Sequence, residues 1–246
     1  MQVYVIIPAA GLGTRMNVPP PATPGTTSSS APAPKQFLEL RGIPILIHTL
    51  RAFAAVAAVR RIHVAARAHE IERVQAQVHE YGLDGRATVV VGGDTRQESV
   101  SAALRSLHAS DDDIVLVHDA VRPLINPATI ERTIEAVIKH GAAIVGVPAI
   151  DTIKQVERTA EGAIIGTTIP RERIVLAQTP QGFRCNLLRR IFREAEADGF
   201  LGTDEASLAE RAGVPVAVVL GSPRNFKITQ PGDLELAEFY LQQGNR

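Results

Sequence analysis

The sequence predicts an α/β fold, a doubly wound and mostly parallel sheet with helices on both faces. Short, β-branched apolar segments alternate along the chain with longer amphipathic segments. Each apolar segment is bounded by Gly, Pro or charged residues, as expected of strands that are covered on both faces. Strand–helix–strand alternation implies right-handed crossovers and parallel pairing. The 246 residues suffice for one large core, so we expect a single domain over 1–246, with two small domains as the alternative.

The elements follow from these two periodicities. The expected strands are 3–7, 62–66, 88–91, 114–117, 143–147 and 216–220. The expected helices are 45–56, 70–81, 96–107, 127–140, 186–197, 204–212 and 233–242. Thr95 and Glu98 have the spacing of a capping box at the start of the third helix. Pro127 suits the first turn of the fourth, where a missing N–H costs nothing.

Composition excludes several classes of protein. Lys and Arg together number 26, as do Asp and Glu, so no overall basic field is present to hold nucleic acid. No apolar run approaches the length of a membrane span. The apolar start at 3–10 lacks a basic leader and runs into glycines instead of a cleavage site, so we expect no export. The single cysteine, Cys185, suits a packed residue in a reducing, cytoplasmic setting.

Two stretches interrupt the alternation. Residues 17–34 hold six prolines among Ser, Thr and Ala, which predicts a flexible, polyproline-like loop beside the proposed site. We expect this loop to order over a bound nucleotide. Residues 150–173 contain two β-rich segments around a turn at 159–162, which predicts a projecting hairpin. Because an isolated two-stranded ribbon is marginally stable in water, we expect a second subunit to cover it.

The first strand ends in PAAGLGTRM at 8–16, a turn of small residues. Ala9, Ala10, Gly11 and Gly13 allow backbone N–H groups to approach phosphate oxygens, at the strand end where α/β sheets bind ligands. The turn lacks the Lys-Ser/Thr of a Walker loop and the third glycine of a dinucleotide fingerprint. A tight structural turn is the alternative; nearby Arg15 and, after the loop, Lys35 favour phosphate binding.

A set of motifs then occurs in order along nearly the whole chain and resembles the methylerythritol phosphate cytidylyltransferase family. The motifs are PAAGLGTRM (8–16), PKQF (34–37), GGDTRQES (92–99), HDAVRP (118–123), DTIK (151–154), QTPQ (178–181), TDEAS (203–207) and NFKIT (225–229). The resemblance implies a Rossmann-like nucleotidyltransferase that transfers CMP from CTP to methylerythritol 4-phosphate in isoprenoid precursor synthesis. It also implies Mg²⁺ or another divalent cation, and a homodimer joined through the 150–173 arm.

The resemblance assigns roles residue by residue. Catalytic roles fall on Arg15 and Lys35 against the triphosphate and on Arg171 and Lys227 at the acceptor phosphate. Nucleotide-binding roles fall on Ala9, Ala10, Gly11, Leu12, Gly13, Gly93, Asp94 and Ser99, the last three reading cytosine. Acceptor-binding roles fall on Asp119, Ala120, Arg122, Thr152 and Thr179, with Thr152 and Arg171 delivered by the partner's arm. Mg²⁺ is expected mainly on the CTP phosphates, with Asp119 as a candidate ligand.

Each assignment has a plainer alternative. Arg15 and Lys35 could be solvated surface charges, and Asp94 or Thr95 a helix cap. Asp119 and Arg122 could form a structural ion pair, and Arg171 could be a charge at the hairpin base, where Arg173 makes the register ambiguous. Arg96 is expected to support the site, and His118 to be an oriented or core histidine.

The chemistry implied by the resemblance makes physical sense for this residue set. A phosphomonoester is substantially dianionic at neutral pH, because its second pKa is about 6. The acceptor therefore needs no base to become nucleophilic. The protein must bring two anions together and stabilise charge on the transferring and leaving oxygens. Cations and backbone donors should dominate, without a Ser/His/Asp triad.

The sequence departs from the family pattern at three places. The segment between Arg15 and Lys35 is longer than usual. Arg224 stands where an acidic residue commonly precedes Asn225, which affects one acceptor-hydroxyl contact, and Val175 replaces an aromatic residue after the arm. A related polyol-phosphate enzyme, such as a ribitol 5-phosphate cytidylyltransferase, and a non-catalytic nucleotide-binding regulator are the alternative functions.

Overall fold

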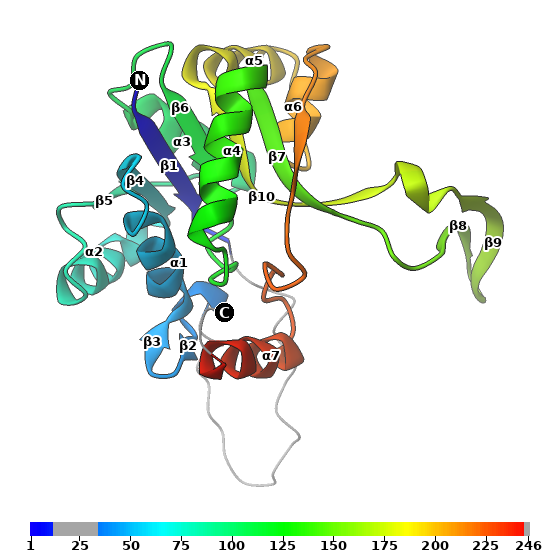
Figure 1. The fold of residues 1–246 in the computed structure, drawn as a ribbon, viewed down its shortest axis with the longest axis horizontal. Helices are drawn as coiled ribbons and strands as arrows, with labels where there is room; N and C mark the ends of the chain where they lie inside the picture. The colour runs from blue at the N-terminus through cyan, green and yellow to red at the C-terminus, as the bar shows by residue number, and fades with distance from the viewer. Residues whose placement is uncertain (12–33, 244–246) are drawn as a thin grey trace, which may run out of the picture.

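In the computed structural model, which describes residues 1–11 and 34–243, a seven-stranded sheet has the order β11-β7-β10-β6-β1-β4-β5 (Figure 1). Its strands are β1 (Val3–Pro8), β4 (Val59–Ala66), β5 (Ala87–Val91), β6 (Ile114–Val117), β7 (Ala142–Pro148), β10 (Val175–Arg184) and β11 (Ala217–Leu220). β1 pairs in parallel with β4 and β6, β4 with β5, and β7 with β11. The six predicted strands and the mostly parallel sheet are confirmed.

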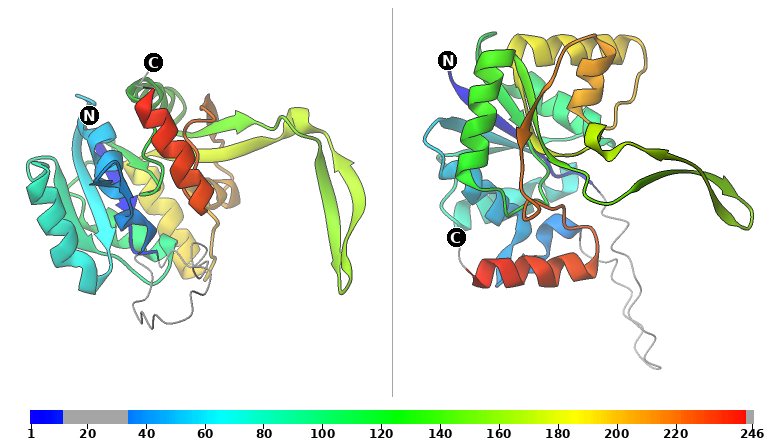
Figure 2. Two further views of the ribbon diagram at one scale, coloured as in Figure 1. Left: turned by 90° about the horizontal axis from the view of Figure 1, so that it is seen from below. Right: turned by 45° about the vertical axis from the view of Figure 1, so that its right-hand side comes forward.

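Helices cover both faces of this sheet, which confirms the doubly wound architecture (Figures 1 and 2). They are α1 (Ile45–Ala54), α2 (Ile71–Glu80), α3 (Arg96–Ser106), α4 (Pro127–His140), α5 (Cys185–Ala197), α6 (Glu205–Arg211) and α7 (Pro231–Gln242). The two faces are visible in β1: Val3, Val5 and Ile7 pack in the core under α1, α2 and α4, whereas Tyr4 and Ile6 pack under α3, α5 and α6.

The predicted helix starts have the expected chemistry. The Thr95 side chain accepts from the Glu98 amide while the Glu98 carboxylate accepts from the Thr95 amide, so the capping box of α3 is confirmed. Pro127 occupies the first turn of α4, where the Asn126 side chain caps the helix. α7 does not pack on the sheet; it packs on the short hairpin formed by β2 (Glu39–Leu40) and β3 (Ile43–Pro44). This hairpin was not predicted.

The central strand β10 was also not predicted. It runs antiparallel to both β6 and β7, and its pairing with β7 is interrupted between Ala177 and Gln181. Pro180 lies in this interruption, and proline lacks the amide that a central strand normally donates. The QTPQ segment therefore reads as a loop in the sequence, although neighbouring strands on both sides make it a strand.

The predicted hairpin is confirmed as β8 (Ile153–Thr159) and β9 (Gly162–Ile169), an antiparallel pair that forms its own two-stranded sheet. Figures 1 and 2 show this arm reaching away from the main sheet. Val156, Ile164 and Ile165 are exposed on it. No helix in the described part of the chain is both long and apolar enough to cross a membrane.

The strand order reverses beside β1: the chain proceeds from β1 to β4 and β5, then returns to β6 on the other side. The carboxyl ends of β1 and β6 thus lie next to each other at a topological switch point, where open α/β sheets bind ligands. Apart from Pro34, the predicted flexible loop 17–34 lies outside the described residues.

Candidate active site

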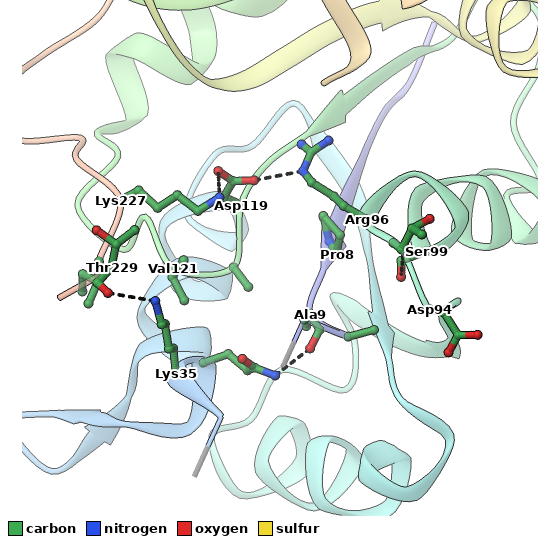
Figure 3. A pocket seen from close by; sticks show the side chains of 16 residues that line it. Pro8, Ala9, Lys35, Asp94, Arg96, Ser99, Asp119, Val121, Lys227 and Thr229 are labelled. Carbon is green, nitrogen blue, oxygen red and sulfur yellow. Dashed lines mark hydrogen bonds and ion pairs between the residues drawn. The ribbon is translucent and has the colours of Figure 1, made fainter. Parts of the chain in front are cut away.

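A pocket opens at this switch point, between the carboxyl ends of β1 and β6 and the start of α3 (Figure 3). It gathers nine of the residues singled out from the sequence: Ala9, Ala10, Gly11, Lys35, Asp94, Ser99, Asp119, Ala120 and Lys227. Segments more than 200 residues apart therefore meet in one cavity. Leu12, Gly13 and Arg15 belong to the same turn but lie outside the described residues.

Two side chains hold the carbonyl oxygens of the glycine turn. The Gln36 amide donates to the Ala9 oxygen at 2.7 Å, and the Arg67 Nε donates to the Ala10 oxygen at 2.6 Å. A carbonyl fixed in this way also fixes the orientation of the peptide N–H that follows it. Sequence reasoning missed both residues. The PKQF motif contained the signal for Gln36, whereas Arg67 gave none.

Ser99 shapes the opposite wall of the pocket. Its hydroxyl accepts from the Gly93 amide at 3.1 Å and donates to the Thr95 carbonyl at 2.8 Å, and its side chain is buried. A Cβ on Gly93 would lie only 2.3 Å from the Glu98 Cβ, so the close turn requires glycine there. Ser99 holds this turn in place, and Asp94 is exposed at the pocket wall.

Three cations surround the Asp119 carboxylate (Figure 3 shows two of them). Arg96 Nε lies 3.2 Å from Oδ1, while Lys227 Nζ and Arg122 Nε lie 3.0 Å and 3.2 Å from Oδ2. Burial raises the pKa of Asp119, but Arg96, Lys227 and Arg122 together hold it well below its usual range. The ion pair of Asp119 with Arg122 is thus present, and it belongs to a larger cluster that faces the pocket.

Behind this cluster, His118 and Thr179 hold the Asp119 backbone. The Asp119 amide donates to the Thr179 hydroxyl at 3.1 Å, and that hydroxyl lies 3.0 Å from His118 Nδ1. His118 Nε2 donates to the Arg122 carbonyl, which can only accept, so Nδ1 must accept from Thr179. Thr179 is buried, and its hydroxyl supports Asp119 instead of lining the cavity.

Lys35 lies on the other side of the cavity. Its Nζ donates to the Thr229 carbonyl at 2.9 Å. Thr229 is itself held by Asp233, whose carboxylate accepts from the Thr229 amide and hydroxyl and from the Gln230 amide. The NFKIT segment therefore contributes Lys227 to one wall and a lysine-binding carbonyl to the other.

The arm residues are not in this pocket. Thr152 precedes β8, and Arg171, which donates to the Ile150 carbonyl, follows β9; neither lines the cavity of its own chain.

Arg122 is largely buried between Asp119 and the Asn225 carbonyl. The unusual Arg224 stacks on Tyr240 with 4.8 Å between its guanidinium carbon and the ring centroid, and Val175 is exposed.

The described residues of the pocket offer a divalent metal no cage of protein ligands. Within the described residues, no group of three His, Cys, Asp or Glu side chains is placed to hold a metal ion. Both oxygens of Asp119, the ligand suggested by sequence, are already paired with cations. A metal ion placed on them would face three positive groups, so Asp119 as it lies here does not fit as a metal ligand.

His118 makes stability depend on pH. Burial lowers its pKa to about 4, from a reference value of 6.5. Between these values the unfolded chain binds a proton that the folded chain does not, so stability falls as pH decreases from about 6.5 toward 4. His63, where burial also lowers the pKa to about 4, acts in the same direction. Asp119, with its depressed pKa, loses its contribution only at lower pH.

We expect the depressed pKa of His118 alone to lower the free energy of unfolding by about 2 kcal/mol when the pH falls from 7 to 5. Urea unfolding at the two pH values measures the total loss, and NMR titration of the imidazole checks its origin. His118 should stay neutral to about pH 4. An imidazole that titrates near pH 6.5 in the folded protein would contradict this assignment.

Comparison with known proteins identifies the family of the chain. The family described as "2-C-methyl-D-erythritol 4-phosphate cytidylyltransferase" matches residues 3–243. A protein of that name from Acidobacterium capsulatum is 70% identical over 243 residues, covering 99% of this chain and 98% of its own. Another from Solibacter usitatus is 50% identical, covering 99% and 97%. The crystal structure of the Francisella tularensis 2-C-methyl-D-erythritol 4-phosphate cytidylyltransferase, 34% identical, superimposes with a TM-score of 0.78 and covers 97% of this chain and 99% of its own.

Proposed function

The chain belongs to the 2-C-methyl-D-erythritol 4-phosphate cytidylyltransferase family, and from this premise we propose how its pocket transfers CMP from CTP to 2-C-methyl-D-erythritol 4-phosphate. The products are 4-diphosphocytidyl-2-C-methyl-D-erythritol, an isoprenoid precursor, and pyrophosphate. One observation carries the residue assignment: the glycine turn, Lys35 and Lys227 converge on one cavity at the switch point. Such a cavity suits two phosphate-bearing substrates held together.

CTP lies, in this proposal, along the glycine turn with its base toward α3. Ala10 and Gly11 offer backbone N–H groups to phosphate, because Gln36 and Arg67 hold the carbonyl oxygens of Ala9 and Ala10. The Ala9 N–H donates to the Ala65 carbonyl at 2.8 Å, so Ala9 lines the site without supplying a donor. The turn at Gly93 and Asp94, held by Ser99, supplies backbone groups to cytosine. Lys35, with Arg15 from outside the described residues, stabilises the negative charge of the triphosphate.

The acceptor lies beside Asp119 and Lys227. Its phosphate oxygen attacks the α-phosphorus of CTP, a new P–O bond forms, and the bond to the β-phosphate oxygen breaks with its electrons. No proton has to be removed from a phosphate dianion, which agrees with the neutral, buried and fully hydrogen-bonded His118. Asp119 and Ala120 face the acceptor, and Lys227 faces its phosphate. Arg122 and Thr179 act from behind, by fixing Asp119.

Mg²⁺ enters, in this proposal, as part of the substrate Mg·CTP. Mg²⁺ keeps several waters and is commonly bound through substrate phosphates. The commitment of both Asp119 oxygens to cations supports this role.

We also propose a homodimer in which the arm, with Thr152 and Arg171, completes the partner's acceptor site. The exposed Val156, Ile164 and Ile165 support the homodimer. The single cysteine, Cys185, is buried and free, which suits a cytoplasmic location.

A pyrophosphate-release assay tests the function. With Mg·CTP, 2-C-methyl-D-erythritol 4-phosphate should react more than about tenfold faster in kcat/KM than ribitol 5-phosphate or erythritol 4-phosphate. Chelation of the metal should stop release, because the triphosphate then lacks charge neutralisation. Faster turnover of ribitol 5-phosphate would assign the chain to another acceptor. Tight CTP binding without turnover of any acceptor would make it a regulator.

A further inference from the structure

Glu205 lies behind the pocket, at the first residue of α6, and does not line the cavity. Its side chain is only 1% exposed. Its position is fixed on both sides: Asp204 caps α6, and Gln181 of β10 donates to the Asp204 carboxylate and accepts from the Ala206 amide. A buried carboxylate on a segment held this firmly needs a cationic partner.

That partner is Arg96, which reaches from the start of α3. Arg96 Nη1 and Nη2 donate to the two Glu205 oxygens at 2.7 Å and 3.0 Å, a bidentate pair. The third guanidinium nitrogen, Nε, donates to Asp119 Oδ1 at 3.2 Å. Burial lowers the pKa of Arg96, but the carboxylates of Glu205 and Asp119 together raise it by more, so the guanidinium stays charged. Arg96 therefore bridges a carboxylate behind the pocket and one inside it.

The bridge determines what remains at the pocket surface. Arg96, Arg122 and Lys227 face the two carboxylates Asp119 and Glu205, which leaves one positive charge in excess. The side chain of Lys227 is 36% exposed, compared with 29% for Arg96 and 11% for Arg122. The excess charge is thus presented mainly at Lys227. Without Glu205, Arg96 would be free to take Asp119 in a bidentate pair and compete with Lys227 for it.

We propose that Glu205 is a positioning residue: through Arg96 it fixes the Asp119 carboxylate and thereby sets where Lys227 meets the acceptor phosphate. This inference rests on the proposed function and extends it to a residue outside the cavity. The sequence contained a signal in TDEAS, but its partner, 109 residues away, is visible only in the fold.

A buried ion pair can instead serve only the fold, and the two roles predict different kinetics. Glu205→Gln keeps the shape of the side chain and removes its charge. We expect its kcat/KM for the acceptor, at saturating Mg·CTP, to fall about tenfold to a hundredfold, the scale on which small misplacements act. The KM for CTP should change less than about threefold, because the glycine turn does not contact Glu205.

The double variant Arg96→Met with Glu205→Met separates positioning from stability. Replacing both members of a buried pair by apolar residues removes the unpaired charge, so its thermal midpoint should stay near that of the wild type. Its kcat/KM should nevertheless be as low as that of Arg96→Met alone, because Asp119 has lost Nε in both. Asp113→Asn is the matched control and should leave the kinetics unchanged, because this buried carboxylate precedes the amino end of β6, whereas the pocket lies at the carboxyl end.

The outcomes are distinct. A double variant with wild-type kcat/KM, or Glu205→Gln with lowered stability and unchanged kinetics, would overturn the positioning role and leave the pair as a fold element. A rise in the KM for CTP that is as large as the fall in kcat/KM for the acceptor would also overturn it. A wild-type enzyme that turns over no acceptor would instead overturn the proposed function.

Discussion

Replacing Lys227 with methionine should lower kcat/KM for the acceptor by about 10²–10³, the usual effect of losing one preorganised charged donor. Lys227 lines the pocket and, of the three cations around Asp119, has the most exposed side chain. Methionine keeps most of the length and removes the charge. Because the acceptor phosphate is repelled by the triphosphate, a lost cation here raises the barrier directly.

The fold should survive this substitution. Asp119 keeps Arg96 and Arg122 as partners, so no buried charge is left alone. Steady-state pyrophosphate release with varied acceptor measures the effect, and thermal unfolding checks the fold. Lys139→Met, an exposed lysine in the last turn of α4, is the matched control and should be silent. A change in kcat/KM below about threefold for Lys227→Met would refute an acceptor-phosphate role for Lys227.

Mixing two inactive variants should restore activity if the site is shared between subunits. Lys35→Ala removes a cation from the pocket, and Arg171→Ala removes one from the arm. Each variant alone should lose about 10²-fold or more in kcat/KM. In a mixed dimer, one site combines the intact pocket of one chain with the intact arm of the other. Equal mixing should then recover about a quarter of wild-type activity, since half of the dimers are mixed and each has one intact site.

The geometry motivates this experiment. Arg171 does not line the pocket of its own chain, and Figure 2 shows the arm directed away from the main sheet. Exposed Ile164 and Ile165 on the arm would be covered by a partner. The control is a double Lys35→Ala, Arg171→Ala variant mixed with Arg171→Ala, which should recover nothing because no intact arm is present. Confirmed mixed dimers without recovery would show that each arm serves its own chain.

Local physics made much of the fold predictable. The helical periodicity of apolar residues and the capping residues predicted the observed bounds of α4 and the capping box of α3, because these features depend on neighbours a few residues apart. The projecting hairpin was equally predictable from two β-rich segments around a turn. β10 was not, because Pro180 contradicts a central strand locally and only pairing with β6 and β7 makes it one.

The sequence by itself determined six strands of the main sheet, the seven helices, the projecting hairpin, the family and the residue types proposed for phosphate binding, since those depend on short-range pattern and on motifs. Only the tertiary structure decided which charges face the pocket. Lys227 and Asp119 share one wall, Thr179 is turned inward to His118, and Glu205 reaches Asp119 through Arg96. These contacts join residues as far apart as 109 positions. Electrostatic energy depends on distance and burial in space, and the sequence contains neither until the chain has folded.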